Sequence, residues 1–395
     1  MIGRILIARA LRSFADGFIA VVLPAYLLAL GLGQLDVGFI STATLLGSAL
    51  ATLAIGRWGN RFSIRRLLLA AALLMAATGL GFAGLTAFWP LLLVAFVGTL
   101  NPSSGDASIF MPLDHTMLAN APDRPGAFAR YSFIGSIAGA IGALAAALPQ
   151  WLATSMTMLQ ALRLMFVLYG AVGFTVWLLY LGLPDPHADA ERPTAPLGPS
   201  RGIVWRLAAL FSIDSFAGGL VLNSLLALWL FERYGMSLAA AAAFFFWTGA
   251  LSAVSQLAAA PLARRIGMVN TMVFTHIPSS VFLIAAALAT RLDVTLACLL
   301  ARSLLSQMDV PARGAFVMSV VTPAERPAAA SFTAVPRSLA AAVSPSITGA
   351  MFAAGAMAAP LVACGILKIA YDLALFAAFR RVEAAASLVQ AMARD

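Results

Sequence analysis

The chain is a succession of long apolar runs separated by short polar turns. Each run has about 20 residues or more, which at about 1.5 Å per residue is enough to cross roughly 30 Å of hydrocarbon as a helix. Because backbone groups in lipid must be hydrogen-bonded within their own segment, the pattern predicts membrane-spanning α-helices. About twelve are predicted, over Ile5–Leu30, Val37–Ile55, Leu67–Thr86, Trp89–Leu118, Tyr131–Leu148, Leu159–Leu183, Val204–Phe231, Leu238–Leu262, Met268–Thr290, Val294–Val321, Ala328–Ala354 and Ala358–Phe379.

Composition supports this pattern and narrows the class of protein. Of the 395 residues, 62% are hydrophobic and 10% are charged, whereas soluble proteins carry roughly 25% charged residues. The fold class predicted is therefore an all-α, multi-pass membrane protein. No phosphate-binding glycine loop, zinc cluster or nucleophile with its base is recognisable, so we expect no enzyme activity and no cofactor.

The distribution of basic residues explains the net charge of +9. A basic protein can bind nucleic acid, but here the arginines gather in alternate short loops, as the positive-inside rule describes. This predicts that both termini are cytoplasmic, with only Arg163, Arg233 and Arg291 outside, and that the partner is the lipid bilayer rather than nucleic acid. Cys298 and Cys364 fall inside apolar runs, so no disulfide framework is expected. The abundance of alanine and arginine suggests a bacterial inner membrane.

A linker divides the chain. The segment Pro184–Gly202 is rich in proline and polar residues and lacks apolar periodicity. We predict an N-terminal six-helix half over residues 1–183, a cytoplasmic linker over 184–203 and a C-terminal six-helix half over 204–395.

Short sequences recur in the two halves at nearly the same offset, which indicates a duplicated unit. The first pair places Asp16 opposite Asp214. The pairs are SFADGF at 13–18 with FSIDSF at 211–216, GRWGNRFSIRR at 56–66 with APLARRIGMVN at 260–270, and Asp-Arg-Pro at 123–125 with Glu-Arg-Pro at 325–327.

The loop at 56–66 carries a recognisable motif. The spacing of its Gly56, Asn60, Arg61, Arg65 and Arg66 resembles that of the loop between the second and third helices of major facilitator superfamily transporters. The chain departs from that pattern at Asn60, where the family has an aspartate that helps to latch the two halves, and at Ser63, where it has a glycine. The resemblance implies that Arg61 serves the conformational cycle.

The resemblance also implies a fold and a function. It implies two six-helix halves with a site between them near the midplane. The expected protein is a monomeric, proton-coupled secondary active transporter that moves a small organic solute or drug by alternating access, for example as an antiporter that mediates efflux. Ala140 stands where drug antiporters have a proline, so drug export is not indicated by sequence. An anion or metal-ion transporter, and a receptor or scaffold that does not transport, are the alternatives.

Ionisable side chains inside a membrane are costly and mark candidate sites. Proton coupling is the functional interpretation, because a poorly solvated carboxyl binds a proton more readily. The alternative is a structural ion pair: Arg12 lies one turn from Asp16, and Arg313 one turn from Asp309. The proton-coupling candidates are Asp16, Asp106, Asp214 and Asp309.

Polar residues in the fourth and tenth spans are candidates for a substrate cavity. Arg302, Ser306, Asp309 and Arg313 follow at steps of three to four, which predicts one polar face on the tenth helix. The sequence NPSSGD at 101–106 should interrupt the fourth helix and free backbone groups for a ligand, or else form a packing kink. For Arg337, interfacial snorkelling is the alternative. The substrate-cavity candidates are Asn101, Ser103, Asn223, Arg302, Ser306, Gln307 and Arg337.

Two further patterns have plainer interpretations. Met268, Met272 and His276 recur every four residues and offer a weak copper(I) site, although methionine in a membrane helix is usually apolar filler. Lys368 and Asp372 lie one turn apart in the last span and are predicted to form a structural pair.

Overall fold

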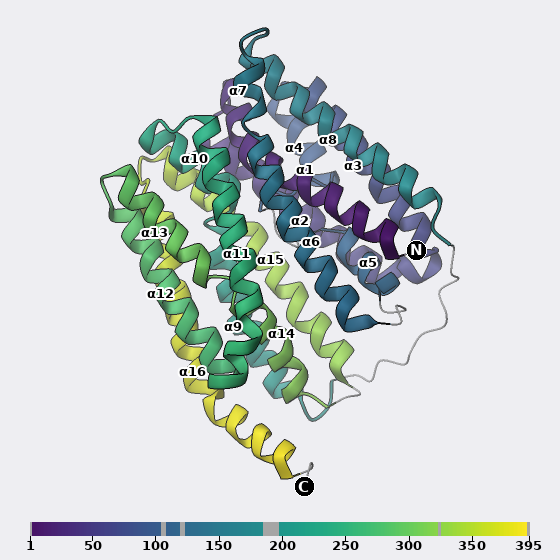
Figure 1. The fold of residues 1–395 in the computed structure, drawn as a ribbon, viewed down its shortest axis with the longest axis vertical. Helices are drawn as coiled ribbons and strands as arrows, with labels where there is room; N and C mark the ends of the chain where they lie inside the picture. The colour runs from purple at the N-terminus through teal and green to yellow at the C-terminus, as the bar shows by residue number, and fades with distance from the viewer. Residues whose placement is uncertain (1, 104–107, 119–122, 185–196, 323–324, 393–395) are drawn as a thin grey trace. The chain divides into compact units, whose positions relative to one another are not determined.

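The computed structural model describes residues 2–103, 108–118, 123–184, 197–322 and 325–392. Within these ranges the protein is helical and has no β-strand (Figure 1). The helices are α1 (Ile2–Ala29), α2 (Gln34–Trp58), the 3₁₀ helix η1 (Gly59–Arg61), α3 (Ile64–Gly84), α4 (Phe88–Val97), α5 (Phe110–Leu118), α6 (Arg124–Ala145), α7 (Leu148–Leu152), α8 (Met158–Leu181), α9 (Arg201–Gly219), α10 (Asn223–Tyr234), α11 (Leu238–Ile266), α12 (Met268–Leu288), α13 (Leu292–Leu305), α14 (Asp309–Val320), α15 (Arg326–Ala353) and α16 (Ala359–Met392).

The helices form two compact units. Unit 1 comprises residues 1–190, 221–250 and 342–357. Unit 2 comprises residues 191–220, 251–341 and 358–395. The units therefore differ from a simple division at the linker, because α10, the first part of α11 and the end of α15 belong to unit 1. The division into halves at 183 and 204 stays a prediction.

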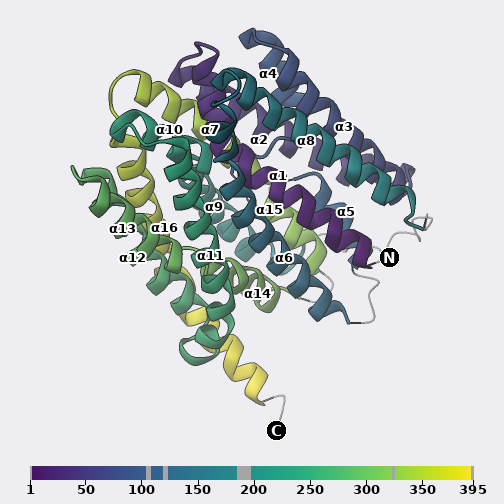
Figure 2. The same cartoon turned by 45° about the horizontal axis from the view of Figure 1, so that its top comes forward.

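Unit 1 is held together by closely crossing helices. The pairs α1–α6 and α3–α8 pack along their lengths, and the latter lie side by side in Figure 2. α2 and α15 meet at Gly38 and Gly349, where a Cβ built on Gly38 would lie 2.7 Å from the carbonyl oxygen of Pro345. Only glycine allows backbones to approach so closely, as is common in membrane helix packing.

Unit 2 has its own apolar core. Its largest members are Phe211, Phe316, Tyr371 and Phe379, each at most 2% exposed. They come from α9, α14 and α16. α9 packs on α14 and α16, and these two helices pack on α12. Figure 1 shows α16 continuing well past α12 toward the C-terminus.

Three predicted spans are interrupted. The fourth span consists of α4 and α5, the seventh of α9 and α10, and the tenth of α13 and α14. The interruption of the fourth span was predicted from its proline and glycine and is confirmed. The continuous polar face predicted for the tenth span is wrong, because the helix stops at Leu305 and restarts at Asp309, which leaves Ser306 and Gln307 in the break.

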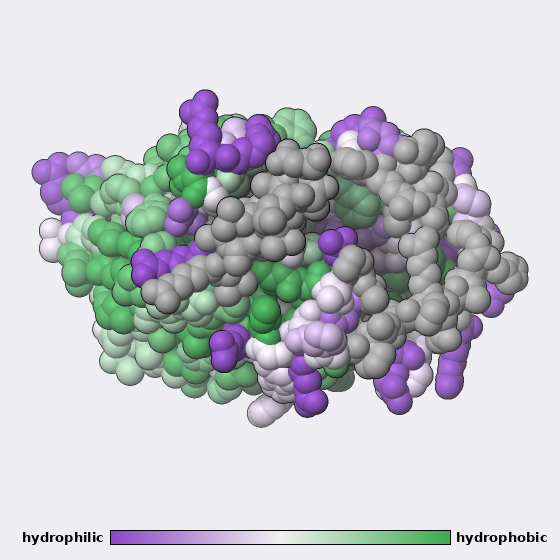
Figure 3. Space-filling model, turned by 90° about the horizontal axis from the view of Figure 1, so that it is seen from below, coloured by the Kyte–Doolittle hydropathy of each residue, from purple (hydrophilic) through white to green (hydrophobic). Residues whose placement is uncertain are grey.

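The surface is that of a membrane protein. Eight helices or helix pairs among the described residues are long and apolar enough to cross a bilayer. Large side chains are widely exposed, including Trp89 at 74% and Leu93 at 64%, and such patches are rare on soluble monomers. Figure 3 shows hydrophobic residues over a broad flank and hydrophilic residues in separate groups. The predicted total of twelve spans stays a prediction.

Candidate functional site

A buried group of charged side chains lies in unit 2. We call it the Asp214 cluster, and its members are Asp214, His276, Asp309, Arg313, Lys368 and Asp372. Lys368 Nζ lies 2.6 Å from Asp214 Oδ1, and Arg313 Nη1 lies 3.3 Å from Asp214 Oδ2. The other terminal nitrogen of Arg313 pairs with Asp309, as the one-turn spacing predicted. Two of the four proton-coupling candidates thus share one arginine.

His276 connects Lys368 to Asp372 within the cluster. Its Nδ1 lies 3.1 Å from each carboxylate oxygen of Asp372, and its Nε2 lies 3.3 Å from Lys368 Nζ. The predicted direct pair of Lys368 with Asp372 is therefore wrong. Lys368 of α16 donates to Asp214 of α9, a helix that packs against α16. Sequence spacing favoured the nearer residue of the same helix.

The copper interpretation of His276 does not fit this geometry. Both ring nitrogens have side-chain partners, so neither is free for a soft metal. Met272 is 1% exposed and belongs to the apolar core of unit 2, and Met268 packs against that core. Among the described residues there is no group of three histidine, cysteine or acidic side chains placed to hold a metal ion.

Local packing brings the helices of the cluster together. A Cβ on Gly365 of α16 would lie 3.0 Å from the carbonyl oxygen of Ser280, so α12 and α16 approach closely beside the cluster. The guanidinium carbon of Arg313 lies 5.5 Å from the ring centre of Phe211, close enough for a cation–π attraction. The buried hydroxyl of Tyr371 has no hydrogen-bond partner among the described residues. The cluster is therefore a polar island inside an apolar core.

Unit 1 contains a smaller charged network. Arg12 of α1 pairs with Asp114 of α5 and donates to the hydroxyl of Tyr180 at 2.6 Å. The hydroxyl of Tyr131 donates to the same carboxylate at 2.8 Å. Asp114 is fully buried. Asp114 was not among the residues predicted from the sequence, although its position inside a predicted span was a usable signal. The one-turn spacing favoured Asp16, which lies closer to Arg12 in the chain.

The break in the fourth span is braced by hydrogen bonds within unit 1. The hydroxyl of Tyr169 donates to the carbonyl oxygen of Thr99 at 3.0 Å. Asn101, 1% exposed, accepts from the backbone and the hydroxyl of Ser103. The backbone N–H of Ser224 donates to the carbonyl oxygen of Pro102 at 3.1 Å, so the start of α10 docks on the break.

The other predicted site residues are scattered over the two units. Asp16 is half-buried in α1 and interacts electrostatically with Tyr169. Asn223 is the first residue of α10. Asp106 lies outside the described residues. These positions leave the four unit 1 candidates, Asp16, Asn101, Ser103 and Asn223, near or on the broken spans.

The two basic candidates in unit 2, Arg302 and Arg337, form no ion pair with a carboxylate in the described part of the chain. Arg337 is half-buried, and its Nε donates to the hydroxyl of Ser215 at 3.1 Å. Arg302 lies in the last turn of α13, which ends at Leu305 before Ser306 and Gln307 in the break. Among the described residues, neither arginine forms an ion pair with an acidic side chain.

The motif loop lies at the ends of helices in unit 1. Arg65 Nη2 donates to the carbonyl oxygen of Leu181 at 2.6 Å and so ties α3 to the end of α8. Gly56 and Arg61 are exposed. Asn60 lies in η1, and its side chain is outside the described part of the chain.

A second polar contact ties the linker to unit 2. Glu325 accepts hydrogen bonds from the backbone of Gly198 and from the hydroxyls of Ser200 and Thr322, the last two at 2.6 Å. These bonds, with that of Ser200 first, lower the pKa of Glu325 to about 2. We call this contact the linker latch.

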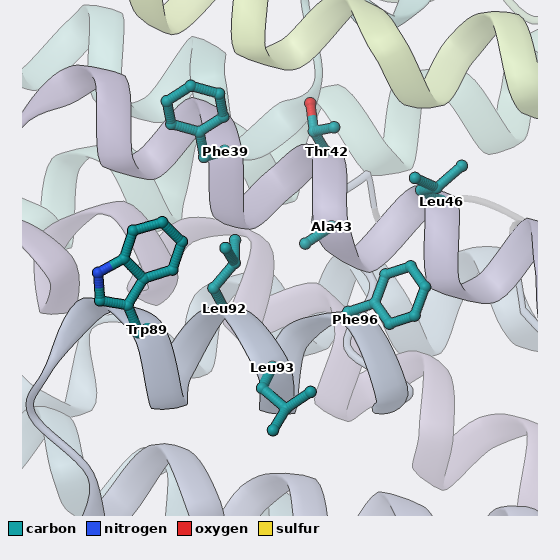
Figure 4. A pocket seen from close by; sticks show the side chains of 8 residues that line it. All are labelled: Phe39, Thr42, Ala43, Leu46, Trp89, Leu92, Leu93 and Phe96. Carbon is teal, nitrogen blue, oxygen red and sulfur yellow. The ribbon is translucent and has the colours of Figure 1, made fainter.

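An apolar groove of about 430 Å³ opens between α2 and α4 in unit 1 (Figure 4). Trp89, Phe39 and Phe96 are its largest walls. The hydroxyl of Thr42 already accepts the N–H of Ser346. The groove offers no charged group and contains none of the predicted site residues, so it is not the candidate site.

Comparisons with known proteins agree with this architecture. The family model described as Major Facilitator Superfamily matches residues 5–305. An uncharacterized membrane protein, YJR124C of Saccharomyces cerevisiae, is 24% identical over 95% of this chain and 93% of its own length.

Similar solved structures share the fold at low sequence identity. They include the xylose transporter XylE from E. coli, inward open (15% identical, 95% of this chain and 96% of that one, TM-score 0.75), and the nucleoside transporter NupG (14%, 96% and 99%, 0.71). A bacterial homolog of the human lysosomal transporter Spinster, inward-facing and unoccupied, is 17% identical over 95% and 94% of the chains, with a TM-score of 0.70.

Proposed function

The chain belongs to the major facilitator superfamily of membrane transporters, and from that premise we propose that it is a proton-coupled secondary transporter of a small organic solute. The observation that carries the proposal is the Asp214 cluster. One buried carboxylate has three cationic or protonatable neighbours, Lys368, Arg313 and His276, on three other helices. A carboxylate that can change partners can couple proton binding to helix movement.

The energetics favour a functional role over a purely structural one. Removing charges from water costs several kcal/mol per ion, of which pairing recovers only part. A stable core could replace such a cluster with apolar residues at little loss of stability. Asp214, Asp309 and Asp372 together therefore represent a cost that a role in proton coupling explains.

Arg302 and Arg337 favour a second candidate, an anionic substrate. Neither of these cations in unit 2 forms an ion pair with an acidic side chain among the described residues. A substrate carboxylate or phosphate would supply the missing charge by bidentate pairing. A ligand screen distinguishes a neutral from an anionic solute.

The first experiment identifies a ligand. Purified protein is screened by thermal shift against metabolites, drugs and metal salts, including nucleosides and pentoses, because a ligand that binds only the folded state raises its apparent stability. The best ligand is then loaded into proteoliposomes with and without an imposed pH gradient. We expect accumulation against a concentration gradient only when the pH gradient is present.

Asp214→Asn tests the coupling residue. The variant should lose gradient-driven accumulation while it keeps exchange of the ligand across the bilayer, because exchange needs no net proton movement. Asp293→Asn is the matched control: Asp293 is exposed and pairs with Arg291 away from the cluster. If Asp214→Asn accumulates ligand like the wild type, the cluster does not couple protons.

We also propose that the protein lies in a bacterial inner membrane with both termini in the cytoplasm. The arginine asymmetry of the loops supports this orientation. A cysteine placed at His187, in the linker, should react with a membrane-impermeant reagent only after the cells are opened. Labelling of intact cells would reverse the orientation.

A further inference from the structure

Three polar atoms form a triangle inside the Asp214 cluster. Lys368 Nζ is 2.6 Å from Asp214 Oδ1 and 3.3 Å from His276 Nε2. His276 Nε2 is 3.9 Å from the same oxygen of Asp214. The imidazole and the ammonium group are thus both placed to bind one carboxylate oxygen, and the ammonium group holds it here.

The contacts define the protonation state of His276 in this arrangement. A charged lysine has only donors, so His276 Nε2 must accept and cannot carry a proton. The hydrogen of a neutral imidazole then lies on Nδ1, which donates to Asp372 at 3.1 Å. The two contacts thus fit a neutral ring, with a donor on one side and an acceptor on the other.

We propose that His276 is the proton-binding switch of this transporter. A proton from water adds to the lone pair of Nε2 and gives an imidazolium. That nitrogen no longer accepts from Lys368, is repelled by its ammonium group, and donates instead to Asp214. Lys368, and with it α16, is released from α9. The inference rests on the proposed function, since it names the group that binds the coupled proton in the Asp214 cluster.

The surroundings stabilise the imidazolium where it forms. Asp372 is fully buried, and its hydrogen-bond partner among the described residues is His276. Lys368 and Arg313 form ion pairs with Asp214 and Asp309. A protonated His276 therefore supplies the cation that is hydrogen-bonded to Asp372.

Other groups around the cluster leave this assignment unchanged. Tyr371 presents a hydroxyl, and Arg337 of α15 donates to Ser215. Arg302 of α13 interacts electrostatically with Cys364 of α16. None of these groups is hydrogen-bonded to the ring of His276. The switch therefore depends on Lys368 and Asp372, which are hydrogen-bonded to the ring, and on Asp214, which lies 3.9 Å from Nε2.

Nitrogen NMR of the full-length protein in nanodiscs tests the proposal. The chain has 3 histidines, so the ¹⁵N signals of histidine-labelled protein are few, and His276→Gln identifies the signal of His276. We expect a neutral ring with its hydrogen on Nδ1 at high pH and an imidazolium at low pH. His115→Gln, in unit 1, should leave this titration unchanged.

Two variants give opposite shifts. Asp372→Asn removes the carboxylate that faces the ring, so the imidazolium should form at a lower pH than in the wild type. Lys368→Met removes the repelling cation, so it should form at a higher pH. Lys368→Met leaves Asp214 paired with Arg313, which favours folding. A ring protonated on Nε2 at high pH, or a ring whose ¹⁵N signals do not change with pH, overturns the proposal.

The outcome is separable from that of the proposed function. If His276 titrates as expected but the wild type accumulates no ligand in response to a pH gradient, the transport proposal fails and the switch stands. If gradient-driven accumulation is found and His276 does not titrate, the switch fails and another group in the cluster binds the coupled proton.

Discussion

The Arg12–Asp114 network makes a quantitative prediction about stability. Asp114→Asn removes the carboxylate charge that pairs with Arg12, at a site where Arg12 is 4% exposed and Asp114 is fully buried. An amide oxygen in the place of Oδ2 can keep the hydrogen bond from Tyr131, so the loss is mainly the uncompensated buried cation. Breaking one side of a buried ion pair costs about 3–5 kcal/mol.

A double-mutant cycle separates the charge from the packing. Arg12→Leu and Asp114→Leu should each lower the free energy of unfolding by about 3–5 kcal/mol, whereas the double variant should lower it by less than either, because no unpaired charge remains. The assay is reversible unfolding in mixed micelles with increasing SDS. A double variant that loses the sum of the two single effects would refute the reasoning, since it would show that the two charges do not interact.

Three further predictions concern the linker latch, the motif loop and the crossing of α2 with α15. Because the pKa of Glu325 is lowered to about 2 from an ordinary value of 4.5, its contribution to stability is fully present above about pH 4.5 and is lost as the pH falls toward 2. Glu325→Ala should accelerate proteolysis of the linker at neutral pH, and an unchanged cleavage rate would exclude a latch. Arg61→Ala should reduce the transport rate but leave the dissociation constant of the ligand nearly unchanged, and a large loss of binding would place Arg61 in the site. Gly349→Ala should lower the melting temperature, because its Cβ would lie 2.8 Å from the carbonyl oxygen of Gln34. The control Gly314→Ala, whose Cβ would have no atom within 4 Å, should leave the melting temperature unchanged. Equal melting temperatures of the two variants would contradict the close crossing.

The length of the apolar runs was sufficient to predict the helices, since burial in lipid leaves few alternatives for 20 apolar residues. The breaks were only partly foreseen. The gap before α14 has no glycine, and the available signal was Pro311, whose ring excludes a helical turn before it. Such a signal is weak, because many membrane helices contain proline without a break, as α1 does at Pro24.

Partners across helices could not be predicted from spacing. The one-turn pair Asp309–Arg313 was found because a helix sets that distance. Lys368 had a carboxylate one turn away and bonds instead to Asp214, 154 positions distant in the chain. Which of two acids a cation meets depends on how α9, α12 and α16 pack, and that is a property of the whole core.

The repeat in the sequence predicted equivalent positions and not equivalent environments. Asp16 and Asp214 occupy matching motifs, yet Asp214 is buried among cations while Asp16 is half-buried near Tyr169. Duplicated helices keep their backbone pattern while their side-chain partners diverge. The coupling role proposed for Asp214 therefore could not be assigned by symmetry.

The central claim is that ligand and protons move together through this protein. Its most direct test is to add the ligand identified by thermal shift outside proteoliposomes that enclose a pH-sensitive dye, with the same pH on both sides at the start. Coupled transport predicts that the internal pH changes as the ligand crosses, and that Asp214→Asn abolishes this change. Entry of the ligand into wild-type proteoliposomes with no change in internal pH would contradict it.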